Sequence, residues 1–215
     1  MRDAAAFIRA ETTLASAPLV PEIRLHLATE IAPIWQASEA FLAARGIEPP
    51  FWAFAWPGGQ ALARALLDAP GMVRGLRVLD FAAGSGIAAI AAARAGAAQV
   101  EASEIDPVAA VAITLNAAAN GAAVRALARD LVGEAPRWDV ILAGDVCYAA
   151  PMTAHILPWL RAMAAAGVRV LLADPGRAWL PREGLEPLSR HSVPTSLELE
   201  DRTERIVTIA RLLPM

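Results

Sequence analysis

The sequence contains no lysine, and all 19 of its basic residues are arginine. Codon bias in a GC-rich genome explains this, since the same bias raises the number of alanines, of which there are 51. The charged residues are dispersed along the chain, and the formal net charge is −3. Because no basic stripe is available for a phosphate backbone, we expect no nucleic-acid partner.

Cysteine and histidine are also scarce. Cys147 is the only cysteine, which excludes an internal disulfide bond. The three histidines, His26, His155 and His191, do not have the spacing of metal ligands, so we expect no metal. A nucleophilic Cys147 paired with His155 is disfavoured, because no second acid or oxyanion turn accompanies the pair.

Long hydrophobic runs are missing as well. Hydrophobic residues make up 56% of the chain, but the longest uncharged run, residues 107–124, includes Thr114 and Asn116 and does not have the character of a membrane span. The first residues include the charged Asp3 and Arg9 and no long apolar segment of the kind found in signal peptides. We therefore expect a cytoplasmic protein without a membrane partner.

The order of helix and strand patterns predicts one globular domain in two parts. Residues 1–70 form a helical and extended segment with an aromatic loop, packed on a core of residues 71–215. In the core, strands alternate with helices at the spacing of βαβ units. A short helix after residue 181 and two strands near residues 192–200 and 204–213 end the chain in an antiparallel hairpin. The predicted fold is α/β, with a Rossmann-like, doubly wound, mostly parallel sheet.

Hydrophobic periodicity predicts four elements within the first part. Two of them are a short helix over residues 3–15 and a half-buried strand over residues 23–27. A helix over residues 37–45 ends at Gly46, and a further helix covers residues 59–68.

The stretch VLDFAAGSGIAA carries glycines where the strand at residues 77–82 becomes a helix. Gly84 and Gly86 let the backbone approach a ligand there, and the N–H groups at the helix end point outward. With Ala89 they also match the G-x-G-x-x-A fingerprint of dinucleotide-binding enzymes, so a dehydrogenase has to be considered. A glycine turn of this kind can also be only a tight connection between a strand and a helix, with no ligand.

Acidic residues end three successive predicted strands. Asp80 ends the first, where it attracts an α-ammonium group and repels a pyrophosphate, and Glu104 ends the second, where a carboxylate accepts hydrogen bonds from ribose hydroxyls. Asp130 ends the third, within reach of an adenine amino group, although a loop-turn role explains it too. Asp106 is better explained as a helix cap than as a ligand. This set of acids suits S-adenosylmethionine, which carries an ammonium group, a ribose and an adenine but no phosphate.

The stretch PPFWAFAWPGGQ, residues 49–60, is rich in aromatic side chains. Aromatic faces attract cations such as a sulfonium or a methylated ammonium. Trp56 and Gly59 are candidates for contact with the cofactor. Trp52 and Phe54 are candidates for binding the substrate, and a hydrophobic lid over the sheet edge explains them equally well.

Two further motifs end the next two strands. WDVILAGDVCY ends with Asp145 and Tyr148, at the edge where a methyl donor would point. Asp145 can accept a hydrogen bond from an attacking amine and orient its lone pair, unless it only caps the following turn, and Tyr148 can wall the site. ADPGR carries Asp174 and Arg177, which suit substrate binding and turn chemistry equally well.

Taken together, PFWAFAWPGGQAL, VLDFAAGSG, SEIDP, ITLNAAAN, GDVCY and DPGR resemble the electron-transfer flavoprotein β-subunit lysine methyltransferase family. The resemblance runs from about residue 19 to the C-terminus, and WPGGQ, GDVCY and DPGR are its most specific motifs. It implies a seven-stranded sheet of order 3-2-1-4-5-7-6 with one antiparallel strand.

The resemblance also implies the site. S-adenosylmethionine is held by Asp80, Gly84, Gly86, Glu104 and Asp130, while the catalytic residues Asp145 and Tyr148 face the target lysine. With Trp56 and Gly59, the predicted cofactor contacts are completed by Ala82, Ile105, Leu131 and Asp145. The predicted substrate contacts are Trp52, Phe54, Asp174 and Arg177. Ala82 departs from the family pattern, which has glycine there.

The predicted function is S-adenosylmethionine-dependent protein-lysine N-methylation without a metal. The resemblance implies the electron-transfer flavoprotein β subunit as substrate, and a ribosomal protein as a further one. One alternative is a nicotinamide-like small-molecule N-methyltransferase, which would have a closed pocket in place of an open groove beside Asp145. The others are a dinucleotide oxidoreductase and a non-catalytic module that binds the cofactor.

Overall fold

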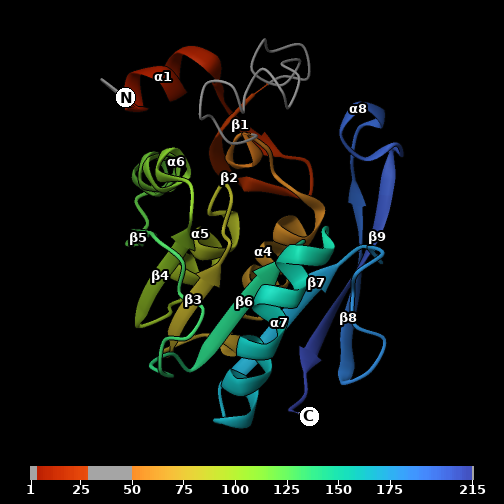
Figure 1. The fold of residues 1–215 in the computed structure, drawn as a ribbon. Coiled ribbons are helices and arrows are strands. Elements are labelled where there is room, and N and C mark those ends of the chain that lie inside the picture. The colour runs from red at the N-terminus through yellow and green to blue at the C-terminus, as the bar shows by residue number, and fades with distance from the viewer. Residues whose placement is uncertain (1–3, 29–49, 215) are drawn as a thin grey trace.

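The computed structural model describes residues 4–28 and 50–214 (Figure 1). The helix predicted over residues 37–45, with its end at Gly46, lies outside these residues. No helix in the described part of the chain is long and apolar enough to cross a membrane.

A seven-stranded sheet forms the centre of the protein, in the order β5-β4-β3-β6-β7-β9-β8 (Figure 1). Its strands are β3 (Arg77–Phe81), β4 (Gln99–Glu104), β5 (Arg125–Ala128), β6 (Val140–Gly144), β7 (Arg169–Asp174), β8 (Leu185–Pro194) and β9 (Glu204–Leu212). β9 is antiparallel to both of its neighbours, while β3 to β7 pair in parallel. The predicted fold class and strand order are confirmed.

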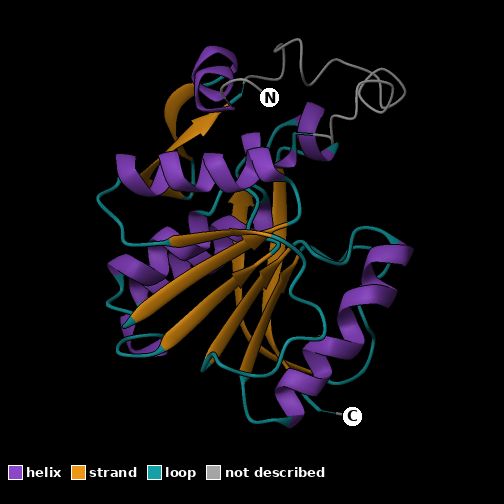
Figure 2. Ribbon diagram, turned by 60° about the vertical axis from the view of Figure 1, so that its left-hand side comes forward, coloured by secondary structure: helices purple, strands orange, loops and turns teal. Residues whose placement is uncertain are grey.

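Helices cover both faces of the sheet (Figure 2). On one face, α4 (Pro57–Asp68), α5 (Ile87–Arg94) and α6 (Pro107–Ala119) share a hydrophobic cluster with the sheet, and α7 (Ala150–Ala165) packs on the other face. The crossovers change face between β3 and β6. At such a switch point the loops on either side diverge and leave a crevice at the carboxyl ends of the strands.

Local signals in the sequence explain where α6 begins. The side chain of Asp106 accepts a hydrogen bond from the N–H of Val108 at 2.8 Å, and Pro107 occupies the first helical position. A proline is tolerated there because its missing N–H would have no partner in the helix. The prediction that Asp106 is a helix cap is confirmed.

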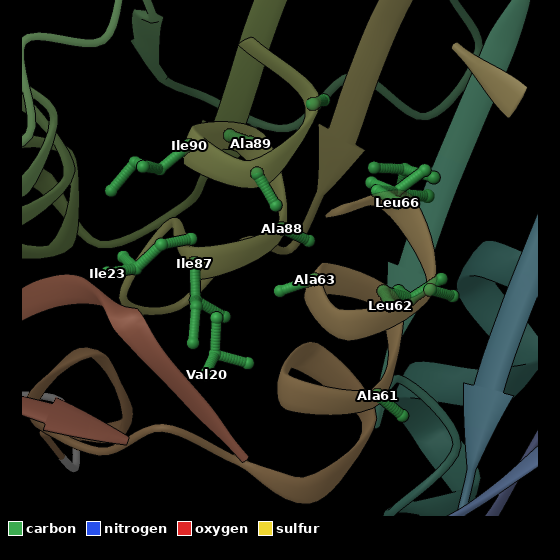
Figure 3. Close-up of a cluster of buried hydrophobic side chains, with 14 of the residues drawn as sticks. Val20, Ile23, Ala61, Leu62, Ala63, Leu66, Ile87, Ala88, Ala89 and Ile90 are labelled. Carbon is green, nitrogen blue, oxygen red and sulfur yellow. The ribbon is translucent and has the colours of Figure 1, made fainter. Parts of the chain in front are cut away.

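The N-terminal segment forms α1 (Ala4–Glu11) and a hairpin of β1 (Thr13–Ala17) and β2 (Val20–Leu27). The predicted strand over residues 23–27 is confirmed, and Ile23 packs with Val20 toward Ile87 of α5 (Figure 3). The predicted helix over residues 3–15 is wrong beyond Glu11, because the following residues pair with β2 and tertiary pairing overrides local helical propensity.

A buried amide joins this hairpin to the glycine turn. Asn116, fully buried in α6, accepts a hydrogen bond from the N–H of His26 at 2.7 Å and donates one to the carbonyl of Ser85 at 2.9 Å. One side chain thus connects β2, α6 and the turn after β3.

The C-terminal hairpin is antiparallel as predicted, but its elements differ from the prediction. The region where a short helix was expected belongs to β8, and residues 197–200 form the helix α8 (Leu197–Glu200) instead of a strand. β8 pairs only with β9 and carries a bulge between Pro187 and Ser189, so its sequence shows no regular alternation. Ser196 begins α8, since its hydroxyl accepts a hydrogen bond from the N–H of Leu199.

The turn before α5 allows a stability test. Gly86 has a φ of 77°, and a Cβ there would lie 3.1 Å from Cγ2 of Ile113. We expect Gly86→Ala to lower the free energy of unfolding by about 2–4 kcal/mol, from left-handed strain plus crowding. Gly121→Ala is the matched control, because Gly121 has a φ of 60° but no atom within 4 Å of its Cβ position. It should cost about 1–2 kcal/mol in urea unfolding. Equal losses would show that Ile113 exerts no constraint.

Candidate active site

A cavity of about 590 Å³ opens at the carboxyl ends of β3, β4 and β6, at the switch point of the sheet. Of the predicted site residues, those that line it are Trp52, Trp56, Ala82, Gly84, Glu104, Ile105, Asp130, Asp145, Tyr148 and Arg177. The structure therefore brings both predicted catalytic residues and most of the predicted strand-end contacts into one space.

The remaining predicted residues do not line the cavity. These are Phe54, Gly59, Asp80, Gly86, Leu131 and Asp174, and all but Gly59 and Gly86 are less than 6% exposed. Their direct contact with cofactor or substrate stays a prediction. Sequence reasoning did not select several residues that line the cavity, among them Phe51, Arg129, Met152 and His155.

Asp80 lies beneath the glycine turn. Its Oδ2 accepts a hydrogen bond from the N–H of Ala89 at 2.8 Å, which anchors the first turn of α5. Burial, with a smaller contribution from the nearby Glu104, raises the pKa of Asp80 to about 8, against the opposing effect of the Ala89 N–H. In the cofactor-free protein the side chain is therefore mostly protonated at neutral pH.

Glu104 lies at the edge of the cavity, where it also holds the glycine turn. Its carboxylate accepts hydrogen bonds from the N–H of Gly84 at 2.7 Å and the N–H of Ile105 at 3.1 Å. Burial raises its pKa, and both N–H groups oppose that shift. A carboxylate at the end of the second core strand fits two vicinal hydroxyls, because it offers about four lone-pair sites and the chain uses two.

Ala82 adopts a left-handed backbone with a φ of 52°, at the place where the family pattern has glycine. A side chain in this region costs about 1 kcal/mol or slightly more. Ala82 lines the cavity, so its methyl group forms part of the cavity wall.

At the end of the cavity away from Asp145, Asp130 pairs with a residue that was not among the predicted site residues. His155 of α7 lies 2.7 Å from Asp130 through its Nε2. Burial raises the pKa of Asp130, but hydrogen bonds from the Val132 N–H and from His155 outweigh it and lower the pKa overall. Asp130 is thus an ionised acceptor with about half of its side chain exposed.

Asp145 is held from two sides. Oδ1 accepts hydrogen bonds from Nε of Arg177 at 3.2 Å and from its NH2 group at 2.7 Å, and Oδ2 accepts one from the N–H of Gly58. Burial raises the pKa of Asp145 to about 6, with Arg177 and the Gly58 N–H opposing the shift. At neutral pH the carboxylate is mostly ionised.

The approach of α4 to Asp145 requires glycine. A Cβ on Gly58 would lie 2.5 Å from the carbonyl oxygen of Ala173, and one on Gly144 would lie 2.8 Å from the N atom of Gly59. Gly58 of WPGGQ and Gly144 of β6 therefore allow α4 to pack closely against the ends of β6 and β7, whereas a Cβ on Gly59 would lie 3.1 Å from Cγ2 of Ile87 in α5.

Aromatic side chains form one wall of the cavity. The ring of Phe51 lies 5.7 Å from that of Tyr148 and 5.8 Å from that of Trp56, whose Nε1 donates a hydrogen bond to the Phe51 carbonyl. Phe51 and Tyr148 are 39% and 47% exposed, so the aromatic wall reaches the surface.

The geometry disfavours Cys147 as a nucleophile paired with His155. Cys147 is buried, and burial raises the pKa of its thiol to about 11, while His155 pairs with Asp130. Within residues 4–28 and 50–214, no group of three or more His, Cys, Asp or Glu side chains could hold a metal ion.

Comparison with known proteins shows which class of enzyme this chain resembles. The family model for ribosomal protein L11 methyltransferase (PrmA) matches residues 64–162. The magnesium protoporphyrin IX methyltransferase of Synechocystis PCC 6803 shares the fold at 22% identity and a TM-score of 0.53, covering 71% of this chain and 79% of that one. The ribosomal protein L11 methylase of Lactobacillus delbrueckii subsp. bulgaricus does so at 23% and 0.51, covering 74% and 79%. The protein is an S-adenosylmethionine-dependent methyltransferase with a Rossmann-like fold.

Curated relatives narrow the class. The electron transfer flavoprotein beta subunit lysine methyltransferase of Xenopus laevis is 41% identical over 204 residues, which covers 91% of this chain and 81% of that protein. The enzyme of the same name from Danio rerio is 38% identical over 193 residues, covering 86% and 74%. The chain belongs to the electron transfer flavoprotein beta subunit lysine methyltransferase family.

The raised pKa of Asp80 predicts a pH-dependent stability. An unfolded aspartate titrates near pH 4, about four units below folded Asp80, so between these values only the folded state retains the proton. This contribution to the free energy of unfolding falls as the pH rises from about 4 to 8 and levels off above. Asp80→Asn cannot ionise, so its stability relative to wild type should increase across that window in urea unfolding without cofactor. Parallel pH curves for the two proteins would contradict the assignment.

The position of Glu104 predicts a loss of cofactor affinity. Glu104→Ala should weaken S-adenosylmethionine binding by about 1.5–3 kcal/mol if the ribose bonds are charge-assisted. Glu104→Gln keeps one acceptor oxygen and should lose less. Calorimetry measures both, and an unchanged dissociation constant for the alanine variant would place the ribose elsewhere.

Proposed function

We propose that this enzyme methylates lysine side chains of a protein, and that its substrate is the electron transfer flavoprotein beta subunit. The observation that carries the proposal is that one cavity extends from Glu104 to Asp145 and Tyr148 and is open at the aromatic end, where Tyr148 is 47% exposed. An open end admits a lysine that is part of a large protein. The names of the relatives support the choice of substrate.

The residues present fit the cofactor. A carboxylate at the second core strand, an ionised Asp130 at the third and aromatic rings beside the fourth match a ribose, an adenine and a sulfonium cation, respectively. When bound, S-adenosylmethionine supplies an electrophilic methyl group. We assign Glu104, Asp130 and Trp56 as its principal contacts.

The chain must favour a neutral acceptor amine. A free lysine has a pKa near 10.4, so roughly one in 2,500 is neutral at pH 7. The aromatic wall lowers that pKa by excluding water, since desolvation disfavours the ammonium form. The proton leaves to water before transfer, because no buried base other than Asp145 lines this end of the cavity among the described residues.

Arg177 offsets the negative charge that Asp145 places beside the acceptor lysine. An unpaired carboxylate at Asp145 would stabilise the ammonium form and oppose deprotonation. Its bonds to the Arg177 guanidinium balance the charge, while a carboxylate still has lone pairs left for the amine. Asp145 then orients the nitrogen without raising its pKa strongly, and Tyr148 confines it from the side.

Transfer of label from S-adenosylmethionine tests the proposal directly. The tag-free enzyme carries no lysine, so we expect label on methyl-lysine of purified electron transfer flavoprotein beta subunit and none on the enzyme. A ribosomal-protein preparation and nicotinamide serve as further acceptors. Label on nicotinamide alone would favour the small-molecule alternative, and stoichiometric label on the enzyme would contradict lysine as the acceptor.

Asp145→Asn should lower turnover tenfold or more and leave cofactor affinity nearly unchanged, because the amide retains the shape but orients the amine less well. Asp139→Asn is the matched control, since Asp139 lies just before β6, at the end opposite Asp145, and pairs with Arg77. Single-turnover methylation measures both. A wild-type rate for Asp145→Asn would show that Asp145 is only a turn residue.

The cytoplasmic location and the absence of nucleic-acid, membrane and metal partners stay predictions from the sequence.

A further inference from the structure

A second hollow, of about 250 Å³, adjoins the open end of the active-site cavity. It is lined by Tyr148, Pro175, Gly176, Arg177, Ala178 and Arg205. Tyr148 and Arg177 line both spaces, so the hollow begins where the acceptor lysine is expected to enter.

One buried carboxylate fixes both arginines of this hollow. Glu200 of α8 is 4% exposed. Its Oε1 accepts a hydrogen bond from NH2 of Arg177 at 2.7 Å, its Oε2 accepts one from Nε of Arg205 at 3.0 Å, and its carbonyl accepts one from NH2 of Arg205 at 2.9 Å. The hairpin of β8 and β9 thereby holds the two guanidinium groups in fixed positions.

Each guanidinium retains unused donors. The NH1 group of Arg177 and that of Arg205 have no hydrogen-bond partner among the described residues, and each carries two N–H donors. Both side chains are partly exposed, at 19% and 27%. A molecule in the hollow that offers oxygen acceptors would satisfy these donors.

The charge balance indicates which kind of acceptor fits. The two guanidinium charges are matched by the carboxylates of Asp145 and Glu200, and Asp174 lies buried behind the hollow with Oδ1 bound to the N–H groups of Gly176 and Arg177. No excess positive charge remains for an anion. Donors without net charge suit neutral oxygens such as peptide carbonyls.

We propose that this hollow binds main-chain carbonyl groups of the acceptor polypeptide next to the target lysine. The inference rests on the proposed protein-lysine function and extends it. Every residue of an extended segment offers a carbonyl, so the hollow recognises an accessible stretch of chain and tolerates different side chains beside the lysine.

Arg205→Gln tests the proposal, because Arg205 does not contact Asp145. We expect KM for the protein acceptor to rise about tenfold, with kcat and the dissociation constant of S-adenosylhomocysteine within twofold of wild type. The tenfold figure corresponds to one hydrogen bond to a charged group. Arg202→Gln, an exposed arginine on the same hairpin, is the control and should leave KM unchanged. An unchanged KM for Arg205→Gln would overturn the proposal.

Acceptor peptides distinguish a carbonyl from a carboxylate as the bound group. With Ala, Asn or Asp beside the lysine, the ratio of KM between Arg205→Gln and wild type should be the same. A larger ratio for the Asp peptide alone would overturn the proposal in favour of an acidic side chain.

A measurement on the unaltered enzyme covers the case in which Arg205→Gln fails to fold. Replacing single peptide bonds beside the lysine by esters weakens the carbonyl as an acceptor. We expect KM to rise severalfold for at least one flanking position, and no change at any position would overturn the proposal. If the wild-type enzyme methylates no protein lysine at all, the proposed function itself fails, and this outcome is distinct from a wild-type enzyme that is active but indifferent to Arg205.

Discussion

The close packing of α4 onto the ends of β6 and β7 is the constraint on which the active site depends. The N–H of Gly58 binds Asp145, and neither Gly58 nor Gly144 has room for a side chain at this contact. This packing of α4 places Trp56 beside the cavity. It also fixes Asp145 between the N-terminus of α4 and Arg177. A larger residue at either glycine would separate the acceptor side of the site from the cofactor side.

The features that depend on neighbours along the chain were predictable from the sequence. Alternating strands and helices gave the parallel sheet, and acids at strand ends gave Glu104, Asp130 and Asp145 at one edge, because parallel strands end together. The cap at Asp106 followed from its position before Pro107.

Features that depend on orientation or on distant contacts were not predictable in the same way. Asp80 ends the correct strand, yet it points beneath the turn toward Ala89, and periodicity alone does not say which face a strand-end side chain takes when both are buried. His155 reaches Asp130 only because α7 crosses that edge of the sheet. The extent of β8 was missed because an edge strand with a bulge lacks the alternation that marks a strand.

Buried charge in this protein is arranged as a chain that leads away from the reaction centre. Asp145, Arg177, Glu200 and Arg205 alternate in sign, and each is bonded to the next. Desolvation makes an isolated buried charge unfavourable, whereas alternation supplies each with an opposite neighbour. The hairpin that closes the sheet thus takes part in the electrostatics of a site formed mainly by other strands.

The buried amide of Asn116 has a consequence for cooperativity. It is bonded at once to the N–H of His26 in the N-terminal hairpin and to the carbonyl of Ser85 in the glycine turn. Opening of the hairpin removes the His26 N–H and leaves the buried Asn116 Oδ1 without this donor, which couples the hairpin to the turn that Asn116 also holds. The N-terminal hairpin lies outside the seven-stranded sheet, yet through Asn116 it contributes to holding the glycine turn in place.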